Sequence, residues 1–343
     1  MSVDQSLHGR SVLITGGAGF LGSHFVRLAV SSGARTVINL DALTYAGDPS
    51  RLSDVEDAPE YQFAHCNIVD REATVAVFAE HRPESVVHFA AESHVTRSES
   101  GPESFFETNV EGTRNVLHAA RETGVDRVIH ISTDEVYGSL DEGTFKESDK
   151  QIGLNRAAPG YATSKSEADD LAMESSGTLN ISVARPTNAF GPGQFPEKAF
   201  PRWLTRALRG ESIPIWGDGL YVRQWLYAED LARAVGILLG KGKSGEAYNI
   251  GPSHDPEITN IDLANWIVKH YQLDDSVIEM TEYDRPNHDR RYSVDASKIR
   301  SLGWEPSDVW QRFAETADWY RANESWWRRH IDEAESIYHD VKK

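Results

Sequence analysis

The feature that most restricts the fold is a glycine-rich loop near the N-terminus, in the segment SVLITGGAGFLGSHFV at 11–26. Gly16, Gly19 and Gly22 follow a short apolar run and precede a helical pattern. Glycines at such positions let the backbone turn sharply and approach a pyrophosphate at the N-terminus of a helix. The spacing differs by one residue from the G-x-G-x-x-G fingerprint but has the same context. The loop therefore predicts a dinucleotide-binding strand–helix unit.

Short β-branched runs alternate with amphipathic segments through the first two-thirds of the chain. The predicted strands are 11–15, 36–40, 61–66, 85–90, 127–132 and 180–186. Such alternation predicts the α/β class, with a Rossmann-type doubly wound parallel sheet that helices cover on both faces.

One of the predicted helices has a clear packed face. In the segment 105–121 the helical spacing of apolar or small side chains selects Phe106, Val110, Thr113, Leu117 and Ala120. We expect these side chains to lie against the sheet.

Asp41 ends the second predicted strand, after the glycine loop. A carboxylate there accepts hydrogen bonds from the 2′ and 3′ hydroxyls of an adenosine ribose and repels a 2′-phosphate, which favours NAD over NADP. The alternative is an aspartate that caps the next helix.

The character of the chain changes after about residue 190, where proline and glycine interrupt the pattern. We expect 8–190 to form an NAD-binding Rossmann domain, with part of 220–250 returning to it. The segment 191–330 then forms mainly a smaller C-terminal lobe that binds the substrate.

The net charge of −18, from 53 acidic and 35 basic side chains, argues against general affinity for nucleic acid or anionic membranes. It predicts a solvated acidic surface, with adaptation to salt as the alternative. The single cysteine, Cys66, excludes an internal disulfide framework, and no H-E-x-x-H pattern occurs, so we expect no metal site. No apolar run approaches the ~18 residues of a membrane span, and MSVDQSLHGR is no signal peptide. We expect a cytoplasmic enzyme.

Tyr161 and Lys165, in the segment YATSK, are spaced by one helical turn, so both side chains can share a face. A tyrosine with an ordinary pKa of ~10 is a poor base at neutral pH, but a nearby ammonium group stabilises its phenolate. A surface pair is the alternative for an isolated Y-x-x-x-K. The glycine loop and a strand that ends in Ser132 and Thr133 favour a catalytic pair.

Two adjacent carboxylates, Asp134 and Glu135, follow the predicted buried strand RVIHI in the segment STDEVYG. Adjacency and burial push the pKa values of two such acids apart, so that one keeps its proton while the other is ionised. Two acids that cap the following segment are the alternative.

Together the glycine loop, the Tyr161–Lys165 pair and the Ser132–Thr133 hydroxyls resemble the extended short-chain dehydrogenase/reductase family. STDEVYG narrows the resemblance to the dTDP-glucose 4,6-dehydratases, and the chain is similar to them from about residue 10 to 305. The other similar stretches are DALTYAG, AAESHVTRS, FGPGQFPEKAFP, PIWGDG, VRQWLYAED, YNIG and DRPNHDRRY.

The resemblance implies NAD-dependent dehydration of dTDP-glucose to dTDP-4-keto-6-deoxyglucose. Oxidation at C4 acidifies the C5 hydrogen, water leaves across C5 and C6, hydride returns to C6 and C5 is reprotonated. It further implies that Tyr161 and Lys165 act at C4, that Thr133 holds the C4 oxygen, that Asp134 protonates the departing hydroxyl and that Glu135 removes the C5 proton.

The resemblance also implies binding residues and a homodimer whose interface is built by helices at about 105–121 and 161–175. Those for NAD are Gly16, Gly19, Phe20, Leu21, Gly22, Asp41, Ala42, Leu43, Thr44, Asn67, Ile68, Ala90, Ala91, Glu92, Ser93, Thr108, Tyr161 and Lys165. Those for the nucleotide-sugar are His94, Thr133, Asn188, Lys198, Ala199, Pro214, Ile215, Trp216, Arg223, Asn249, Asp284, Arg285, Pro286, Asn287 and His288. Arg223 and Arg285 suit a pyrophosphate, since a guanidinium group forms bidentate hydrogen bonds with it. The alternative is that both arginines form ion pairs on the surface.

The chain departs from the family pattern at Thr96, Ala189, Gln224 and Asn287, which leaves the base and the sugar open. A 4-epimerase or decarboxylase of the same family is one alternative function, but an epimerase needs no acid pair at C5 and C6. A non-catalytic dinucleotide-binding regulator is another, and the presence of all the reactive groups argues against it.

Overall fold

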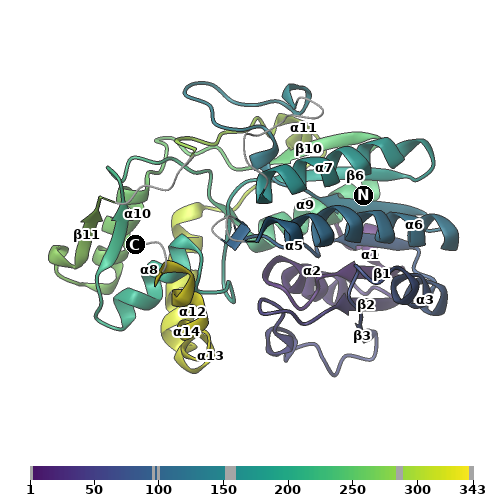
Figure 1. Ribbon diagram of the computed structural model, residues 1–343, viewed down its shortest axis with the longest axis horizontal. Coiled ribbons are helices and arrows are strands. Elements are labelled where there is room, and N and C mark those ends of the chain that lie inside the picture. Colours follow the sequence, from purple (N-terminus) through teal and green to yellow (C-terminus); the bar gives the residue numbers. More distant parts are fainter. Residues whose placement is uncertain (1–2, 95–96, 99–100, 151–159, 283–288, 340–343) are drawn as a thin grey trace.

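A computed structural model describes residues 3–94, 97–98, 101–150, 160–282 and 289–339. Its centre is a seven-stranded parallel sheet with the strand order β10-β6-β5-β4-β1-β2-β3 (Figure 1). The strands are β1 (Ser11–Thr15), β2 (Thr36–Asp41), β3 (Tyr61–His65), β4 (Ser85–His88), β5 (Arg127–Ile131), β6 (Ile181–Pro186) and β10 (Glu246–Ile250). The sheet confirms the predicted doubly wound fold, and β10 is a strand that the sequence pattern did not predict.

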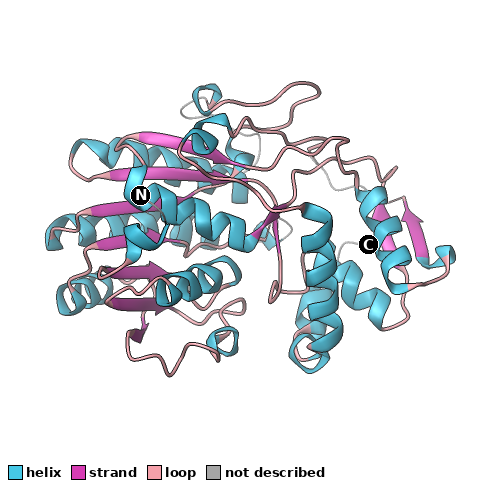
Figure 2. Ribbon diagram, turned by 180° about the vertical axis from the view of Figure 1, so that it is seen from behind, coloured by secondary structure: helices cyan, strands magenta, loops and turns pink. Residues whose placement is uncertain are grey.

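Helices cover both faces of the sheet, as Figures 1 and 2 show from opposite sides. On one face lie α1 (Val3–Leu7), α2 (Phe20–Ser31) and α9 (Ala228–Lys241), and on the other α3 (Arg71–His81), α6 (Thr113–Thr123) and α7 (Tyr161–Glu174). Each face has its own apolar core, because the Val- and Ile-rich strands are buried on both sides.

The predicted helix at 105–121 is not one regular α-helix. A short α5 (Pro102–Phe106) is followed by a π-helical segment, η2 (Glu107–Gly112), before α6 begins. The wider turn changes the register, so that Phe105 is buried in place of the predicted Phe106, which is half-buried. Gly112 ends the π-helical segment where a Cβ would lie 2.6 Å from the Ile68 side chain.

A smaller lobe lies beside the carboxyl ends of the strands and has a separate aromatic core. Its elements are α8 (Ala199–Leu208), β8 (Ile213–Trp216), α10 (Asn260–Tyr271), β11 (Ile278–Thr281), α12 (Val309–Ala322), α13 (Glu324–Arg328) and α14 (Ile331–His339). β8 and β11 form a parallel pair, and β7 (Ala189–Phe190) pairs with β9 (Leu226–Tyr227) where the chain passes between the two parts.

The chain passes between the two parts more than once. After α8 and β8 it returns to the sheet as α9 and β10, and β10 pairs with β6. It then enters the lobe again at α10 and returns at α11 (Ser297–Ser301), which packs against β10. The two cores are therefore interleaved in sequence.

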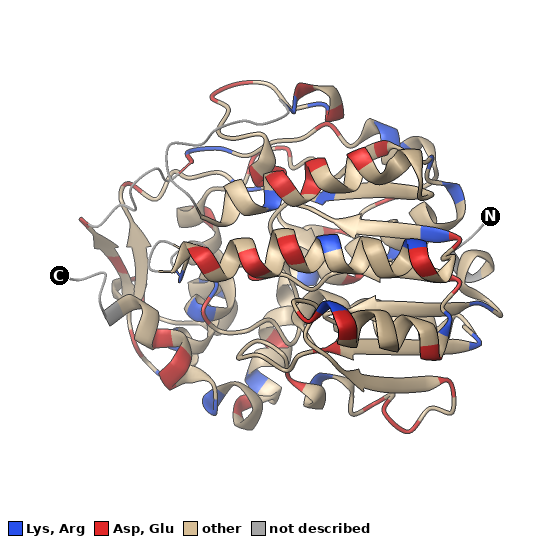
Figure 3. Ribbon diagram, turned by 45° about the vertical axis from the view of Figure 1, so that its right-hand side comes forward, with Lys and Arg blue, Asp and Glu red and all other residues tan. Residues whose placement is uncertain are grey.

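Acidic side chains outnumber basic ones on the helices that cover one face of the sheet (Figure 3). This distribution agrees with a net charge of −18. Within the described ranges, no helix combines the length and apolarity that crossing a membrane requires.

Candidate active site

A cavity of about 480 Å³ lies at the carboxyl ends of the strands, between the sheet and the smaller lobe. It is lined by the segments that follow β1 to β5 and by residues of the smaller lobe. Ligands of doubly wound sheets bind at this edge, where neighbouring connections leave on opposite faces. In this chain that point is between β1 and β4.

The glycine loop forms one wall of the cavity. Gly16 has a φ of +71°, and a Cβ there would lie 2.7 Å from the backbone nitrogen of Ala90. A Cβ at Gly22 would lie 2.1 Å from the carbonyl oxygen of Gly16, so the loop packs on the first turn of α2 without side chains. Gly19 precedes this helix, and the N-terminus of α2 therefore opens into the cavity.

Asp41, the last residue of β2, lies beside the loop with 7% of its surface exposed. Its Oδ2 accepts a hydrogen bond from the backbone N–H of Ala18 at 2.9 Å, and its Oδ1 accepts one from Leu43 at 2.8 Å. Burial raises the pKa of this carboxyl, while the two backbone donors act in the opposite direction. The carboxylate is thus fixed at the cavity wall.

The segment STDEVYG places Thr133, Asp134 and Glu135 directly after β5. Thr133 caps the short 3₁₀ helix η3 (Asp134–Val136), because its Oγ1 accepts a hydrogen bond from the Glu135 N–H at 3.3 Å. The Thr133 hydroxyl donates to Asp134 Oδ1 at 3.2 Å. All three residues line the cavity.

The two adjacent acids have different environments. Asp134 is 3% exposed, whereas Glu135 is half-buried. Burial, reinforced by the charge of Glu135, raises the pKa of Asp134 from 3.8 to about 7. Its Oδ2 has no hydrogen-bond partner in the described part of the chain. Asp134 is therefore the acid that holds a proton near neutral pH.

Tyr161 and Lys165 occupy the first turns of α7 and line the same cavity. Lys165 is 4% exposed and its Nζ donates to the carbonyl oxygen of Ile131 at 2.6 Å. Burial lowers the pKa of this ammonium group to about 8.

The pKa of Tyr161 is raised rather than lowered. Burial is the main cause and the charge of Glu135 adds to it, whereas a hydrogen bond with the Thr133 side chain opposes them. The expectation that Lys165 makes this phenol a usable base therefore stays a prediction for the protein with its ligands bound. An additional positive charge in the cavity would act in the required direction.

Buried polar contacts hold the reactive segments in place. Arg185 on β6 donates two hydrogen bonds to Asp169 of α7, at 2.9 and 2.8 Å, and one to the Tyr137 hydroxyl at 2.8 Å. Asn109 donates to Ser164 Oγ at 2.9 Å and to the backbone oxygen of Glu92 at 3.0 Å. These contacts fix α7 relative to both the STDEVYG segment and the loop after β4.

Most of the predicted binding residues line this one cavity. For the cofactor these are Gly16, Gly19, Phe20, Leu21, Gly22, Asp41, Ala42, Thr44, Asn67, Ile68, Ala90, Ala91, Glu92, Ser93, Thr108, Tyr161 and Lys165. For the nucleotide-sugar these are His94, Thr133, Asn188, Lys198, Ala199, Pro214, Trp216 and Arg223.

Three predicted residues do not line the cavity. Leu43 adopts a φ of +51° in the turn after β2, and Ile215 is fully buried in the core of the smaller lobe. Asn249 is also fully buried, where it accepts a hydrogen bond from the Tyr137 hydroxyl at 2.7 Å and donates to the Phe145 carbonyl oxygen at 3.0 Å. Its contacts support the STDEVYG segment. The residues Asp284 to His288 lie outside the described ranges.

Two of the four departures from the family pattern lie in the described ranges. The Gln224 side chain accepts from the Val294 N–H at 2.9 Å and donates to Ser293 Oγ at 3.2 Å, so it joins two segments that are far apart in the sequence. Ala189 lines the cavity, and its carbonyl oxygen accepts from the Gln194 side chain at 3.0 Å. Thr96 and Asn287 lie outside the described ranges.

Several lining residues were not predicted. Arg51 is 6% exposed and donates to the backbone oxygens of Gly193 at 2.7 Å, Ala46 at 2.7 Å and Ala18 at 3.0 Å. No sequence motif marks it.

Glu197, Tyr292 and Tyr338 also line the cavity without having been predicted. The first two lie within quoted family stretches, FGPGQFPEKAFP and DRPNHDRRY, which could have indicated them. Tyr338 lies near the C-terminus and has no such signal.

Basic side chains gather at the end of the cavity that the smaller lobe forms. Arg223 donates to the backbone oxygens of Val222 at 2.7 Å and Asp289 at 2.9 Å, and its guanidinium carbon lies 4.7 Å from the centre of the Tyr292 ring. Lys198 Nζ donates to the Ser93 carbonyl oxygen at 2.7 Å. In so acidic a chain, this end suits an anionic ligand.

Residues 12–251 match the NAD dependent epimerase/dehydratase family. The dTDP-glucose 4,6-dehydratase 1 of Escherichia coli strain K12 is 40% identical, over 92% of this chain and 94% of its own. The low-salt glycan biosynthesis protein Agl12 of Haloferax volcanii is 42% identical, over 86% and 93%. The crystal structure of DesIV, a dTDP-glucose 4,6-dehydratase from Streptomyces venezuelae with NAD and a second ligand bound, is 41% identical, with a TM-score of 0.87 over 92% of this chain and 98% of its own. The chain therefore belongs to the NAD dependent epimerase/dehydratase family and, within it, to the dTDP-glucose 4,6-dehydratases.

Proposed function

We propose that this protein is a hydro-lyase that converts dTDP-glucose to dTDP-4-keto-6-deoxyglucose and water, with NAD as its cofactor. The observation that carries the proposal is the common cavity of Asp134, Glu135, Tyr161 and Lys165. An oxidation at C4 alone would use only the tyrosine and lysine, whereas elimination of water needs an acid and a base as well.

The residues of the cofactor end fit NAD. The absence of a side chain at Gly16 leaves the loop close to Ala90, and the N-terminus of α2 faces the cavity where a pyrophosphate would be bound. The fixed carboxylate of Asp41 suits the two ribose hydroxyls. When bound, NAD accepts hydride from C4 and returns it to C6, and its oxidised ring brings a positive charge into the cavity.

Tyr161 removes the proton of the C4 hydroxyl in this proposal, and Thr133 donates a hydrogen bond to the same oxygen. Burial and the charge of Glu135 hold the Tyr161 pKa high in the protein alone. The Lys165 ammonium, together with the positive charge that a bound oxidised cofactor would supply, would favour the phenolate. Chemistry at C4 is thereby coupled to the presence of the cofactor.

Asp134 and Glu135 divide the elimination between them. Asp134 keeps a proton near neutral pH, with a pKa raised to about 7 by burial, so it can protonate the departing C6 hydroxyl. Glu135 is more exposed to the cavity and removes the proton at C5. The assignment follows from the unequal burial of the two neighbours.

The smaller lobe binds the nucleotide. Arg223 and Lys198 supply positive charge for the diphosphate, and Trp216 supplies an apolar wall for the base. The Oδ1 atom of Asn188 lies buried at the cavity without a hydrogen-bond partner in the described part of the chain, so it is available to a ligand hydroxyl.

Isotope transfer tests the proposed reaction. The protein with NAD is incubated with dTDP-glucose deuterated at C4, and the product is analysed by mass spectrometry and NMR. We expect loss of one water and recovery of deuterium at C6. Unchanged mass with inverted configuration at C4 would replace the proposal with a 4-epimerase. UDP-glucose, GDP-mannose and an N-acetylated sugar, run in parallel, test the base and the sugar.

A variant separates the two acids. With Glu135→Gln we expect reduced cofactor to accumulate, because C4 is oxidised but C5 keeps its proton, while no dehydrated product forms. Glu72→Gln, which alters an exposed acid of α3, is the matched control and should behave as the wild type. Finished product at the wild-type rate in Glu135→Gln would exclude the assigned base.

We further propose that the protein works as a homodimer in the cytoplasm. The helices α6 and α7 lie side by side on one face of the sheet and supply the surface expected for the interface. Light scattering on the purified protein tests the dimer, and a monomeric mass would contradict it.

A further inference from the structure

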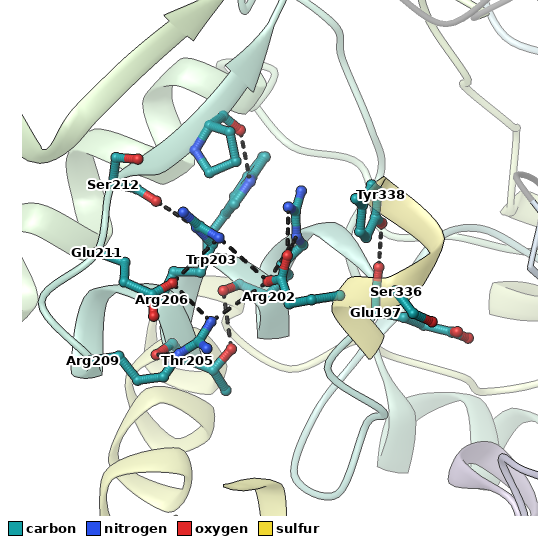
Figure 4. A network of polar contacts seen from close by, with 12 residues as sticks. Glu197, Arg202, Trp203, Thr205, Arg206, Arg209, Glu211, Ser212, Ser336 and Tyr338 are labelled. Carbon is teal, nitrogen blue, oxygen red and sulfur yellow. Dashed lines mark hydrogen bonds and ion pairs between the residues drawn. The ribbon is translucent and has the colours of Figure 1, made fainter. Parts of the chain in front are cut away.

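The C-terminal helix α14 reaches the substrate cavity. Among the described residues that line the cavity, Tyr338 alone comes from the chain beyond Tyr292. Its hydroxyl donates to the backbone oxygen of Glu197 at 2.5 Å, and Figure 4 shows this contact between the C-terminal helix and the segment before α8. A residue with no motif around it thus forms part of the site.

The ring of Tyr338 contacts predicted nucleotide-binding residues. Its centre lies 6.0 Å from that of Trp216 and 6.4 Å from that of His94, edge-on in both cases. The Arg202 guanidinium carbon lies 3.7 Å from the ring centre on a face of Tyr338. Edge-to-face pairs and cation–π contacts of this kind fix the orientation of aromatic rings.

The helix that carries Tyr338 is held on α8 by Glu335. Arg202 Nη2 lies 2.8 Å from a Glu335 oxygen, and Arg206 and Arg209 each place a guanidinium nitrogen 3.5 Å from the other oxygen. Burial raises the Glu335 pKa, but the hydrogen bonds and charge of Arg202 outweigh it, and the pKa is lowered overall. Figure 4 shows Arg202 and Arg206 of α8 and Arg209, which directly follows this helix, close to one another.

The contacts are at the nucleotide end of the cavity. Trp216 ends β8, whose Pro214 carbonyl oxygen accepts a hydrogen bond from the Trp203 indole at 3.1 Å, while Lys198 and Ala199 begin the adjoining α8. The reactive groups come from other elements, η3 and α7. We therefore expect a change at Tyr338 to affect nucleotide binding more than the rate of the chemical steps.

We propose that Tyr338 is a positioning residue for the nucleotide of the substrate. It holds the Trp216 ring edge-on, so that a face of the indole stays available to the base, and it closes this end of the cavity against water. Glu335 acts through Tyr338, because its ion pairs hold α14 on α8. The inference rests on the proposed function and extends it to a residue outside the family stretches.

Binding of thymidine diphosphate to the NAD-loaded protein, measured by calorimetry, tests the inference without turnover. With Tyr338→Ala we expect the dissociation constant and the KM for dTDP-glucose to rise about tenfold, with kcat within about twofold of wild type. Tyr338→Phe keeps the ring and should stay within about threefold. Glu335→Gln should weaken binding by less than Tyr338→Ala does. The effect of Glu335→Gln should be larger at low salt, where its ion pairs are less screened.

Control variants distinguish a specific role of Tyr338 in binding from a general effect on α14. Asp332→Asn alters an exposed acid of the same helix and should leave the dissociation constant unchanged. Tyr338→Leu keeps apolar bulk should the alanine variant fail to fold, and it should still weaken binding. An unchanged dissociation constant in both the Ala and Leu variants, or a loss of kcat alone, overturns the inference. Wild-type protein that binds thymidine diphosphate through Tyr338 but lacks turnover would reject the proposed function only.

Discussion

The two ends of the cavity are built in different ways. The cofactor end consists mainly of the segments that directly follow β1, β2, β3 and β4, and its loop contains glycines at which a Cβ would meet the backbone. The nucleotide end consists of side chains from distant segments, among them Glu197, Trp216, Arg223, Tyr292 and Tyr338. The first end is formed by loops at the ends of neighbouring strands, while the second is assembled from side chains that are far apart in the sequence.

The difference also determines which kind of substitution weakens ligand binding at each end. A backbone cradle is damaged by added atoms, because there is no room for them. A side-chain wall is damaged by removed atoms, because charge or packing is lost. Four predictions test this contrast, from the largest expected effect to the smallest.

Tyr161→Phe tests the proposed reaction centre, which lies between the cofactor end and the nucleotide end of the cavity. We expect kcat to fall by about 10³-fold or more, since the proton acceptor at C4 is lost, while both NAD and thymidine diphosphate bind as in the wild type. Steady-state kinetics and calorimetry measure the two quantities. Wild-type turnover in this variant would remove the catalytic role assigned to Tyr161.

Gly16→Ala tests the backbone cradle. Both Gly16 and Gly124 have a φ of +71°, but a Cβ at Gly16 meets Ala90 at 2.7 Å, whereas one at Gly124 has nothing within 4 Å. We expect Gly124→Ala to cost about 1 kcal/mol of stability and to leave NAD affinity unchanged. Gly16→Ala should cost more and lower NAD affinity about 100-fold. Equal effects of the two substitutions on NAD binding would contradict the role given to the loop.

Arg223→Gln tests the side-chain wall. We expect the KM for dTDP-glucose to rise about 10- to 30-fold, because a charged hydrogen-bond donor to the diphosphate is lost, with NAD affinity unchanged. Arg223→Lys should recover only part of the loss, since an ammonium cannot bond bidentately. A fall in NAD affinity of the same size would show that the two ends are not separable.

Asp134→Asn tests the cost of the buried acid. The Asp134 pKa is 3.8 when exposed and about 7 in the folded protein, where burial is the main cause. Between pH 4 and pH 7 the unfolded chain has released this proton while the folded protein still holds it. The aspartate therefore lowers the free energy of unfolding more and more as pH rises, and this destabilisation levels off above pH 7. We expect Asp134→Asn to gain about 1–3 kcal/mol of stability between pH 5 and pH 8, measured by denaturant unfolding. A pH-independent difference would show that Asp134 is ionised throughout.

The parts of the fold that could be predicted depend on local patterns. The strands β1 to β6, the turn at Gly16 and the position of Asp41 follow from periodicity and from the spacing of a few residues. The strand β10 was missed because its pairing with β6 depends on the path of the 63 residues between Pro186 and Ile250, not on its own sequence. The change from Phe106 to Phe105 depends on a π-helical turn, which simple helical spacing does not indicate.

The same reasoning applies to the site. That Tyr161, Lys165, Asp134 and Glu135 line the cavity could be predicted, because the members of each pair are close in sequence. Arg51 and Tyr338 could not, since each reaches the cavity through tertiary contacts with segments far along the chain. The resemblance to a family indicated Asn249 as a ligand contact, but burial and its hydrogen bond with Tyr137 place its side chain away from the cavity.

The interleaving of the two cores limits how this enzyme can be re-engineered. One core contains Leu226, Ile250 and Trp304 together with N-terminal strands, while the other contains Phe190, Ile267 and Trp327. No single cut in the sequence separates them, so the smaller lobe is not a transferable module that could be expressed alone or exchanged at one junction. A change of substrate by grafting would need several segments moved together, whereas point substitutions in the cavity leave both cores intact.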